Sequence, residues 1–248
     1  MRDLDAELHE LRARIDRAAR VCVLSGAGMS AESGIPTFRD ALTGLWSRFD
    51  PAQLASEEGF RADPRLVWDW YAQRREGVRA AQPNAGHLAL GAFAQRRPGV
   101  LTVVTQNVDD LHQRAGNADA IRLHGDILAD RWLQPCRCRP RRDPGEAEPG
   151  RPPRCPGCGA LVRPGVVWFG EMLPEGAMEA AERAARAAEL MLVVGTSGAV
   201  WPAAGLAGTA RRAGAFVAIV NPHDSEIDAS AQLLLPGTAA QILPRLFA

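Results

Sequence analysis

The stretch Arg20-Val-Cys-Val-Leu-Ser-Gly-Ala-Gly-Met-Ser-Ala-Glu-Ser-Gly-Ile-Pro-Thr-Phe-Arg-Asp40 decides the fold of this chain. Its apolar run Val21–Leu24 predicts a buried parallel strand, and the chain then turns through Gly26-Ala27-Gly28. A G-x-G-x-x-A pattern after a strand lets a pyrophosphate approach the N-terminus of the next helix, although ligand-free tight turns carry it too. In a dehydrogenase a second strand would follow and end in an acidic residue that binds the ribose, about 20 residues further on. Asp50 has roughly this offset, but it precedes a proline in a loop-like segment and is therefore a poor ribose ligand. The stretch therefore favours a bound dinucleotide without hydride chemistry.

The charge balance of the chain excludes several classes of partner. Its 248 residues include 29 Lys and Arg against 29 Asp and Glu, so no global field attracts nucleic acid or a membrane surface. No apolar run is long enough to cross a membrane. Residues 1–20 are charged and amphipathic, unlike a secretory leader. We therefore expect a cytoplasmic protein with no nucleic-acid and no membrane partner.

Apolar runs alternate with helical segments along the rest of the chain. Strands are predicted at 100–105, 120–124, 190–194, 215–220 and 232–235, and helices at 65–79, from Asn84, at 175–188, at 201–212 and at the C-terminus. This alternation predicts an α/β fold, a doubly wound parallel sheet of the Rossmann-like type with helices on both faces. Ligands bind at the carboxyl ends of such strands, which here are Ser25-Gly26, Gln106-Asn107, His124-Gly125, Gly195-Thr196-Ser197 and Asn221.

Residues 135–165 are rich in Pro, Arg, Gly and Cys, and they lack apolar periodicity. Four of the five cysteines lie there as C-x-C and C-x-x-C, namely Cys136, Cys138, Cys155 and Cys158, whereas Cys22 is a predicted core residue. Four thiolates complete the tetrahedral coordination of one zinc ion, Zn2+, and leave no open position for water, so we predict a structural zinc site. The alternative is that the four cysteines bind no metal. We predict a single domain over residues 1–248. It has a large Rossmann-like part at about 1–30, 85–130 and 166–248, an inserted zinc module at about 131–165 and a helical insert at about 40–84.

Two further features are candidates for chemistry. His124 ends a predicted strand at the ligand-binding edge, whereas His87 and His112 lie in helical patterns that are typical of packed histidines. Tyr71, the only tyrosine, lies three residues before Arg74 on one face of a predicted helix. The pair can clamp a carboxylate through a bidentate guanidinium and a phenol, or it can be a core-edge tyrosine beside a solvated arginine.

These motifs resemble, in collinear order, those of the sirtuins, a family of NAD-dependent protein deacylases. The resemblance is carried by 26–39, by Gln106-Asn-Val-Asp109, by His124-Gly125, by the four clustered cysteines, by Val167-Trp-Phe-Gly-Glu171 and by Gly195-Thr-Ser197. Tyr71 and Arg74, together with the small Ala55, resemble class III sirtuins, which remove succinyl and malonyl groups. The resemblance implies that NAD is consumed as a co-substrate, that one structural Zn2+ is bound and that acylated lysines on proteins are the substrates. Nicotinamide would be released and the acyl group would pass to ADP-ribose.

The resemblance also implies a role for each matching residue. His124 would be the general base, acting through a ribose hydroxyl, and Asn107 and Asp109 would position the nicotinamide ribose and carboxamide. The remaining NAD contacts would come from Gly26, Ala27, Gly28, Ser30, Ala31, Ile35, Pro36, Phe38, Arg39, Trp46, Gln106, Val108, Gly195, Thr196, Ser197, Asn221, Pro222, His223 and Ala239. The acylated peptide would contact Ala55, Tyr71, Arg74, Val167, Phe169, Gly170 and Glu171, with 167–171 pairing beside it as an added strand.

Three alternatives remain at this stage. The same NAD site would serve a mono-ADP-ribosyltransferase with a different acceptor. A general deacetylase would lack the preference for acidic acyl groups, and a zinc-containing NAD sensor would lack catalysis. Asp110 stands where the family commonly has glycine.

Overall fold

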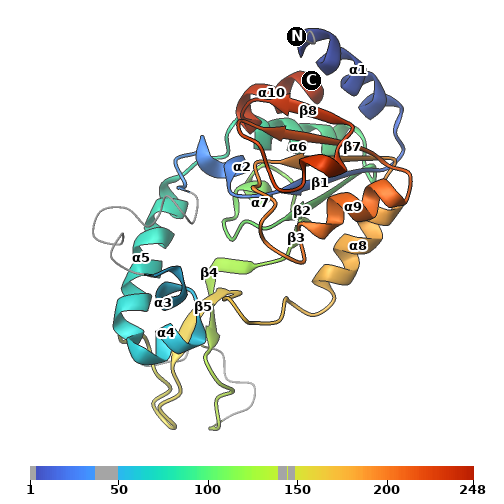
Figure 1. Cartoon of the computed structure of the whole chain (residues 1–248). Coiled ribbons are helices and arrows are strands. Elements are labelled where there is room, and N and C mark those ends of the chain that lie inside the picture. Colours follow the sequence, from blue (N-terminus) through green and yellow to red (C-terminus); the bar gives the residue numbers. More distant parts are fainter. Residues whose placement is uncertain (1–3, 37–49, 139–143, 145–148) are drawn as a thin grey trace. The chain divides into compact units, whose positions relative to one another are not determined.

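The computed structural model describes residues 4–36, 50–138, 144 and 149–248. The chain forms two compact units (Figure 1). Unit 1 comprises Met1–Thr37, Ala81–Leu123 and Pro174–Ala248, and unit 2 comprises Phe38–Ala80 and His124–Leu173. Three predicted NAD contacts, Phe38, Arg39 and Trp46, lie outside the described residues.

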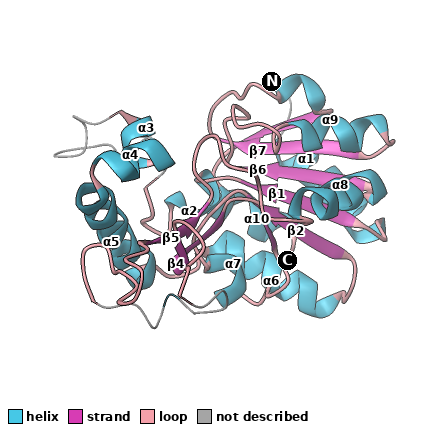
Figure 2. Cartoon of the chain, turned by 90° about the horizontal axis from the view of Figure 1, so that it is seen from below, coloured by secondary structure: helices cyan, strands magenta, loops and turns pink. Residues whose placement is uncertain are grey.

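Unit 1 is built on a six-stranded parallel sheet with the order β3-β2-β1-β6-β7-β8. Figure 2 labels β2, β1, β6 and β7 in the middle of this sheet. Its strands are β1 (Val21–Ser25), β2 (Leu101–Thr105), β3 (Ile121–Arg122), β6 (Leu190–Val194), β7 (Phe216–Asn221) and β8 (Leu233–Pro236). The central strand β1 pairs with β2 on one side and with β6 on the other. The strand order therefore reverses at β1 and β6, and ligands of open parallel sheets bind beyond the carboxyl ends of the strands at such a switch point.

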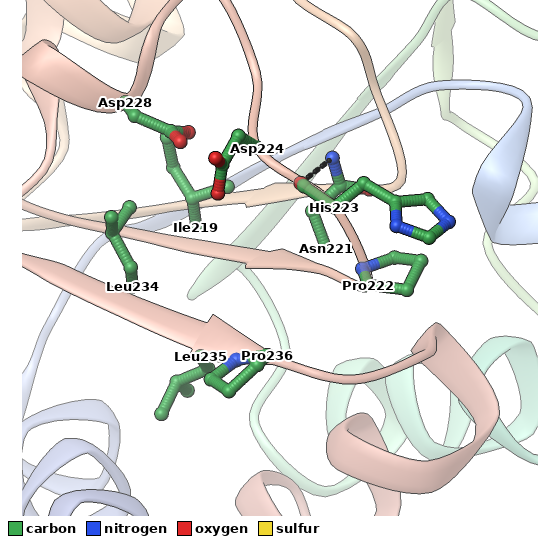
Figure 3. Close-up of a pocket in the computed structure, with 9 residues that line it drawn as sticks. All are labelled: Ile219, Asn221, Pro222, His223, Asp224, Asp228, Leu234, Leu235 and Pro236. Carbon is green, nitrogen blue, oxygen red and sulfur yellow. Dashed lines mark hydrogen bonds between the residues drawn. The ribbon is translucent and has the colours of Figure 1, made fainter. Parts of the chain in front are cut away.

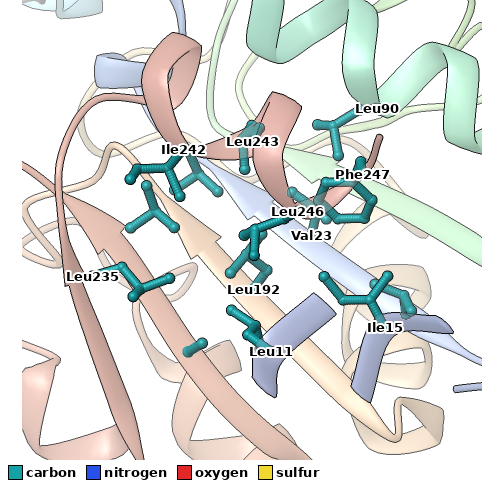
Figure 4. Close-up of a cluster of buried hydrophobic side chains, with 14 of the residues drawn as sticks. Leu11, Ile15, Val23, Leu90, Leu192, Leu235, Ile242, Leu243, Leu246 and Phe247 are labelled. Atoms are coloured by element: carbon teal, nitrogen blue, oxygen red, sulfur yellow. The ribbon is translucent and has the colours of Figure 1, made fainter. Parts of the chain in front are cut away.

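Helices cover both faces of this sheet because successive side chains of a buried strand point to opposite sides. Val21 and Val23 belong to one core, with α1 (Leu4–Arg17), α6 (Ala85–Arg96) and α10 (Ala239–Leu246). Figure 4 shows part of this core, where side chains of α1 and α10 lie against β1 and β6. Cys22 and Leu24 belong to the other core, with α8 (Ala177–Ala187) and α9 (Gly205–Arg212). The predicted α/β fold is confirmed, and Cys22 is the expected core residue.

Capping side chains define where several helices begin. Asn84 Oδ1 accepts hydrogen bonds from the backbone N–H groups of Gly86 and His87, so α6 begins where the sequence predicts. Thr238 begins α10 with a capping box, in which its hydroxyl and the Gln241 side chain each accept the other residue's N–H. Helix α9 begins only at Gly205, because residues 201–204 form a turn before it.

Unit 2 combines three helices with a two-stranded antiparallel ribbon. The helices are α3 (Pro51–Leu54), α4 (Glu57–Ala62) and α5 (Pro64–Ala80), and the strands are β4 (Gly125–Trp132) and β5 (Val162–Val166). β4 is absent from the sequence prediction because a bulge between Asp126 and Asp130 interrupts its alternation. The buried guanidinium of Arg75 fills this bulge, donating to Ile127 O at 2.5 Å and pairing with Asp130 Oδ1 at 2.6 Å.

The described part of the region predicted to lack regular structure contains strand pairing. β5 lies at its C-terminal end, and Arg154 bridges Leu161 in antiparallel fashion. The remaining short elements are α2 (Gly28–Ala31), α7 (Leu111–Arg114) and the 3-10 helix η3 (Asp228–Ser230). Among the described residues, no helix has the length and apolar character that crossing a membrane requires.

Candidate active site

The glycine loop after β1 packs directly against the loop after β6. Gly26 N–H donates to Val194 O at 2.9 Å, and Gly28 N–H donates to Gly195 O at 2.8 Å. A Cβ on Gly26 would lie 2.7 Å from the Cβ of Thr196, and a Cβ on Gly28 would lie 2.8 Å from the Cα of Gly195. Both glycines are therefore required for this close approach. The helix that follows, α2, is one turn of four residues and not the longer helix expected after a dinucleotide loop.

Three buried polar side chains meet beside this loop. The Ser30 hydroxyl of α2 donates to Asp109 Oδ2 at 2.9 Å, and Asn107 Nδ2 donates to Ser30 Oγ at 3.1 Å. Asn107 and Asp109 follow β2, so two segments far apart in the sequence supply the group. Burial raises the pKa of Asp109, while hydrogen bonds from Leu111 N–H and Ser30 act in the opposite direction. The arrangement offers amide and carboxyl groups to a polar ligand at the switch point of the sheet.

The Ser30 network rests on two fully buried histidines, His87 and His112, whose rings lie 4.9 Å apart. Because the Ser30 hydrogen is directed at Asp109, Ser30 Oγ is an acceptor for His87 Nε2, which lies 3.5 Å away. Burial lowers the pKa of His87 to about 3 and that of His112 to about 4, so both rings are neutral at pH 7.

His112 supports the turn that carries Asn107. Ser25 Oγ donates to Thr105 Oγ1 at 2.8 Å, so it is the acceptor for His112 Nε2 at 2.9 Å. Thr105 Oγ1 in turn accepts the backbone N–H of Asn107 at 3.0 Å. The ends of β1 and β2 are thus joined by a chain of hydroxyl groups that begins at a buried imidazole.

Two arginines fix the loop that follows β2. Arg122 Nη2 donates to the carbonyl oxygens of Val108 and Asp109, each at 2.9 Å. Arg114 Nε pairs with Asp110 Oδ1 at 3.0 Å, one helical turn away. This ion pair gives a physical reason for an acidic residue at 110. Arg122 is not among the predicted site residues, and its only signal in the sequence is a basic residue inside an otherwise apolar predicted strand.

A pocket of about 210 Å³ lies at the carboxyl end of β7 and beside β8 (Figure 3). Asn221 Nδ2 donates to His223 O at 2.8 Å and to Thr196 O at 3.3 Å, which connects this pocket to the loop after β6. The lining residues are Ile219, Asn221, Pro222, His223, Asp224, Asp228, Leu234, Leu235 and Pro236. Three predicted NAD contacts are therefore brought together here. Ala239, another predicted contact, is 3% exposed and belongs to the core of α10.

Tyr71 and Arg74 lie one turn apart on α5 in unit 2. Tyr71 is 2% exposed, and its phenol oxygen accepts a hydrogen bond from Trp168 Nε1 at 3.0 Å. The Arg74 guanidinium stacks on the neighbouring Trp70, with its Cζ 4.8 Å from the indole centroid and 5.8 Å from that of Tyr71. Burial raises the pKa of Tyr71 and Arg74 opposes the shift, so the phenol keeps its proton at neutral pH. A buried phenol beside a half-buried, stacked guanidinium fits both the clamp and the core-edge alternative.

His124 and the segment 167–171 also belong to unit 2. The carbonyl of half-buried His124 accepts the N–H of Val167 at 2.9 Å, and the carbonyl of buried Ala55 accepts that of Phe169 at 2.9 Å. The N–H of Trp168 donates to Glu171 Oε2 at 2.8 Å, and Glu171 N–H donates back to Trp168 O. Four of the five N–H groups in this segment are thus engaged internally, so an added peptide strand would bond chiefly through carbonyl oxygens.

The four clustered cysteines, Cys136, Cys138, Cys155 and Cys158, have their sulfur atoms within 4.8 Å of one another. The Sγ of Cys136 lies 3.4 Å from that of Cys155 and 3.6 Å from that of Cys158. Four thiolates at the usual zinc–sulfur distance of about 2.3 Å have sulfur atoms about 3.8 Å apart, so this donor set fits a tetrahedral zinc ion. The pKa of Cys158 is lowered to about 6, chiefly by the backbone N–H of Ala160. The one-residue spacing of the first pair is therefore compatible with the site.

Comparison with known proteins places these features in one family. The sequence model of the Sir2 family matches residues 26–202, well over half of the chain. The chain belongs to the Sir2 family. It is 55% identical over 240 residues to an NAD-dependent protein deacylase of Ralstonia nicotianae, covering 96% of this chain and 95% of that protein. It is 52% identical over 243 residues to an NAD-dependent protein deacylase of Methylococcus capsulatus, covering 96% and 94%.

Solved Sir2 structures share the fold over almost the whole length. A Sir2 homologue in complex with NAD has a TM-score of 0.84 at 41% identity, with 96% of this chain and 92% of the other covered. Sir2Tm bound to a propionylated peptide has a TM-score of 0.82 at 29% identity, with 97% of each chain covered. For this Sir2-family chain, the resemblance inferred from its motifs is thus confirmed.

The structure also gives supporting roles to residues of this Sir2-family chain to which the sequence analysis assigned no role of their own. Trp168 binds the phenol of Tyr71, and Ser25 and Thr105 carry the hydrogen bonds from His112 to the Asn107 turn. None of these positions stands out by residue type. Their roles follow only from which side chains the parallel sheet and the ribbon bring together.

Proposed function

We propose that this chain is an NAD-dependent protein-lysine deacylase that releases nicotinamide and transfers the acyl group to ADP-ribose. The observation that carries the proposal is the buried group of Ser30, Asn107 and Asp109 beside the glycine loop. Oriented amide and carboxyl groups of this kind suit the carboxamide and ribose hydroxyls of a nicotinamide nucleotide. The deacylase names of relatives that cover almost the whole chain support the same reaction.

The residues divide the work of the reaction. Asn107 and Asp109 position the nicotinamide half of NAD, and the loops around Gly26, Gly28 and Gly195 hold its phosphates. The pocket at Asn221 receives the adenosine half. His124 acts as the general base on a ribose hydroxyl once the acyl oxygen has replaced nicotinamide. The four cysteines hold one zinc ion, which cross-links the turns of the ribbon and takes no part in the chemistry.

Turnover of NAD with an acyl-lysine peptide tests the reaction. Wild type is expected to form nicotinamide, free lysine peptide and acyl-ADP-ribose in equal amounts, and His124→Ala is expected to form none while remaining folded. His9→Ala, on the exposed face of α1, is the matched control and should keep full activity. NAD-dependent labelling of protein without peptide deacylation would instead show an ADP-ribosyltransferase. Binding of NAD without nicotinamide release would show a sensor.

We further propose a preference for acidic acyl groups such as succinyl and malonyl. The buried phenol of Tyr71 and the stacked guanidinium of Arg74, with the small Ala55 in the same unit, support this preference. A hydrogen bond to a charged group contributes about 1.5–3 kcal/mol, which corresponds to about one to two decades in kcat/KM. Deacetylation is retained, because neither side chain takes part in bond breaking. Competition between succinylated and acetylated copies of one peptide measures the preference, and a ratio at or below unity would contradict it.

A further inference from the structure

The hydrogen bond between Trp168 and Tyr71 can run in one direction only. An indole N–H is a donor and has no acceptor capacity, so the phenol oxygen accepts from Trp168 Nε1 at 3.0 Å. The phenol hydrogen must therefore point away from the indole. A carboxylate accepts hydrogen bonds and donates none, so a phenol whose hydrogen is directed outward is prepared for a carboxylate ligand.

The indole of Trp168 is itself held on several sides. It is 2% exposed, the ring of Phe60 lies 5.3 Å from it, and the guanidinium carbon of Arg163 lies 3.3 Å from its ring centroid. The backbone N–H of Trp168 donates to Glu171 Oε2 at 2.8 Å. Stacking on one ring face and a backbone hydrogen bond fix both the plane of the indole and the direction of its N–H.

Arg163 connects the indole of Trp168 to strand β5 of the ribbon. Its guanidinium is almost completely buried, donates to Val166 O at 2.7 Å and pairs with Glu171. Glu171 also pairs with Arg131 at 2.7 Å, so two arginines share one carboxylate. Together with Arg74, positive charge exceeds negative charge around the Tyr71 phenol, and such a surplus favours an anionic ligand.

We propose that Trp168 is a positioning residue for acyl groups that end in a carboxylate. Its Nε1–H turns the Tyr71 hydroxyl toward the ligand carboxylate, and the Arg163–Glu171 pair holds the indole in place. The inference rests on the proposed acidic-acyl preference and deepens it. Trp168 selects among acyl groups only through Tyr71, so an acyl group without a carboxylate gains nothing from its N–H.

Trp168→Phe tests this role because it keeps an aromatic ring and removes the N–H. The ratio of kcat/KM for succinyl over acetyl peptide should fall about two- to tenfold, the range for one hydrogen bond, because any effect on peptide pairing along 167–171 lowers both values of kcat/KM equally and cancels in the ratio. Tyr71→Phe should lower the same ratio, and adding Trp168→Phe to it should cause no further fall. Trp68→Phe is the matched control, since Trp68 stacks on Arg75 instead and should leave the ratio unchanged. Equal losses for both acyl groups, or additive losses in the double variant, would overturn the role.

A second readout does not depend on acyl preference. Tyr71 is the only tyrosine in the chain, so isotope-labelled tyrosine gives one phenol signal by NMR. The indole N–H stabilises the phenolate, so Trp168→Phe should raise the pKa of Tyr71, and an unchanged pKa would overturn the proposed bond. Trp168→Phe could raise the pKa of Tyr71 while the wild type shows no preference for the succinyl peptide. That combination would overturn the acidic-acyl function, and with it the proposed role of Trp168. A succinyl preference that Trp168→Phe leaves intact would overturn the role of Trp168 alone.

Discussion

Acid should destabilise the fold through His87 and His112, the two histidines under the Ser30 network. Burial lowers their pKa values to about 3 and about 4, against about 6.5 in the unfolded chain. Between pH 6.5 and these values the unfolded state binds protons that the folded state does not bind. The free energy of unfolding therefore falls as pH decreases through this interval, and it is fully retained above pH 6.5.

The size of the effect follows from the distance below pH 6.5. At pH 5 each histidine that remains neutral in the folded state lowers the free energy of unfolding by about 2 kcal/mol. The two histidines together therefore lower it by about 4 kcal/mol relative to pH 7. The neighbouring Asp109 acts in the opposite direction, because its raised pKa lets the folded state take up a proton before the unfolded state does.

Urea unfolding at pH 7 and pH 5 measures this difference. His112→Gln keeps a side-chain N–H for Ser25 and removes the titrating ring, so the loss between the two pH values should shrink by about 2 kcal/mol. His87→Gln should shrink it by a similar amount, and the exposed control His9→Gln should leave it unchanged. An equal loss of stability in wild type and in both buried variants would refute the assignment of acid sensitivity to these rings.

Three further predictions concern stability and metal content. Gly91→Ala in α6 should destabilise the fold by several kcal/mol in thermal unfolding, because its Cβ would lie 1.8 Å from Ala115 O. Gly77→Ala in α5 places a Cβ that meets nothing within 4 Å, so it should stabilise the fold by about 1 kcal/mol. Arg75→Met should lower the free energy of unfolding by about 1–3 kcal/mol, because the carbonyl oxygen of buried Ile127 loses its donor, whereas Arg151→Met, which breaks the exposed pair with Asp69, should cost much less. Metal analysis should find one zinc ion per wild-type chain and none in Cys155→Ser, with Cys22→Ser retaining it; zinc retained by Cys155→Ser would contradict the assigned site.

The sheet of this protein could be predicted because its strands are continuous apolar runs between helices. Burial on both faces leaves little room for another interpretation of Leu190–Val194 or Phe216–Asn221. The ribbon was less predictable. β4 carries a bulge and several exposed residues, and its pairing with β5 joins segments about thirty residues apart across a region of low apolar content.

In the candidate site, too, some residues could be predicted from the sequence and others could not. Short motifs identified Ser30, Asn107, Asp109 and the cysteines, because their chemistry depends on residue type and local spacing. The supporting residues depend on distant contacts. His112 acts on Asn107 through Ser25 and Thr105, and Trp168 reaches Tyr71 across 97 positions of sequence. Their residue types alone do not indicate these supporting roles, since buried tryptophan and histidine are also ordinary core residues.

The most direct measurement compares one lysine peptide, acetylated or succinylated, with NAD, for wild type, Arg74→Met and the exposed α5 control Arg79→Met. We expect wild type and Arg79→Met to prefer the succinyl peptide by about one to two decades in kcat/KM. We expect Arg74→Met to lose that preference while it still deacetylates. A wild type that favours the acetyl peptide, together with an Arg74→Met variant that behaves identically, would show a general deacetylase and contradict the carboxylate clamp.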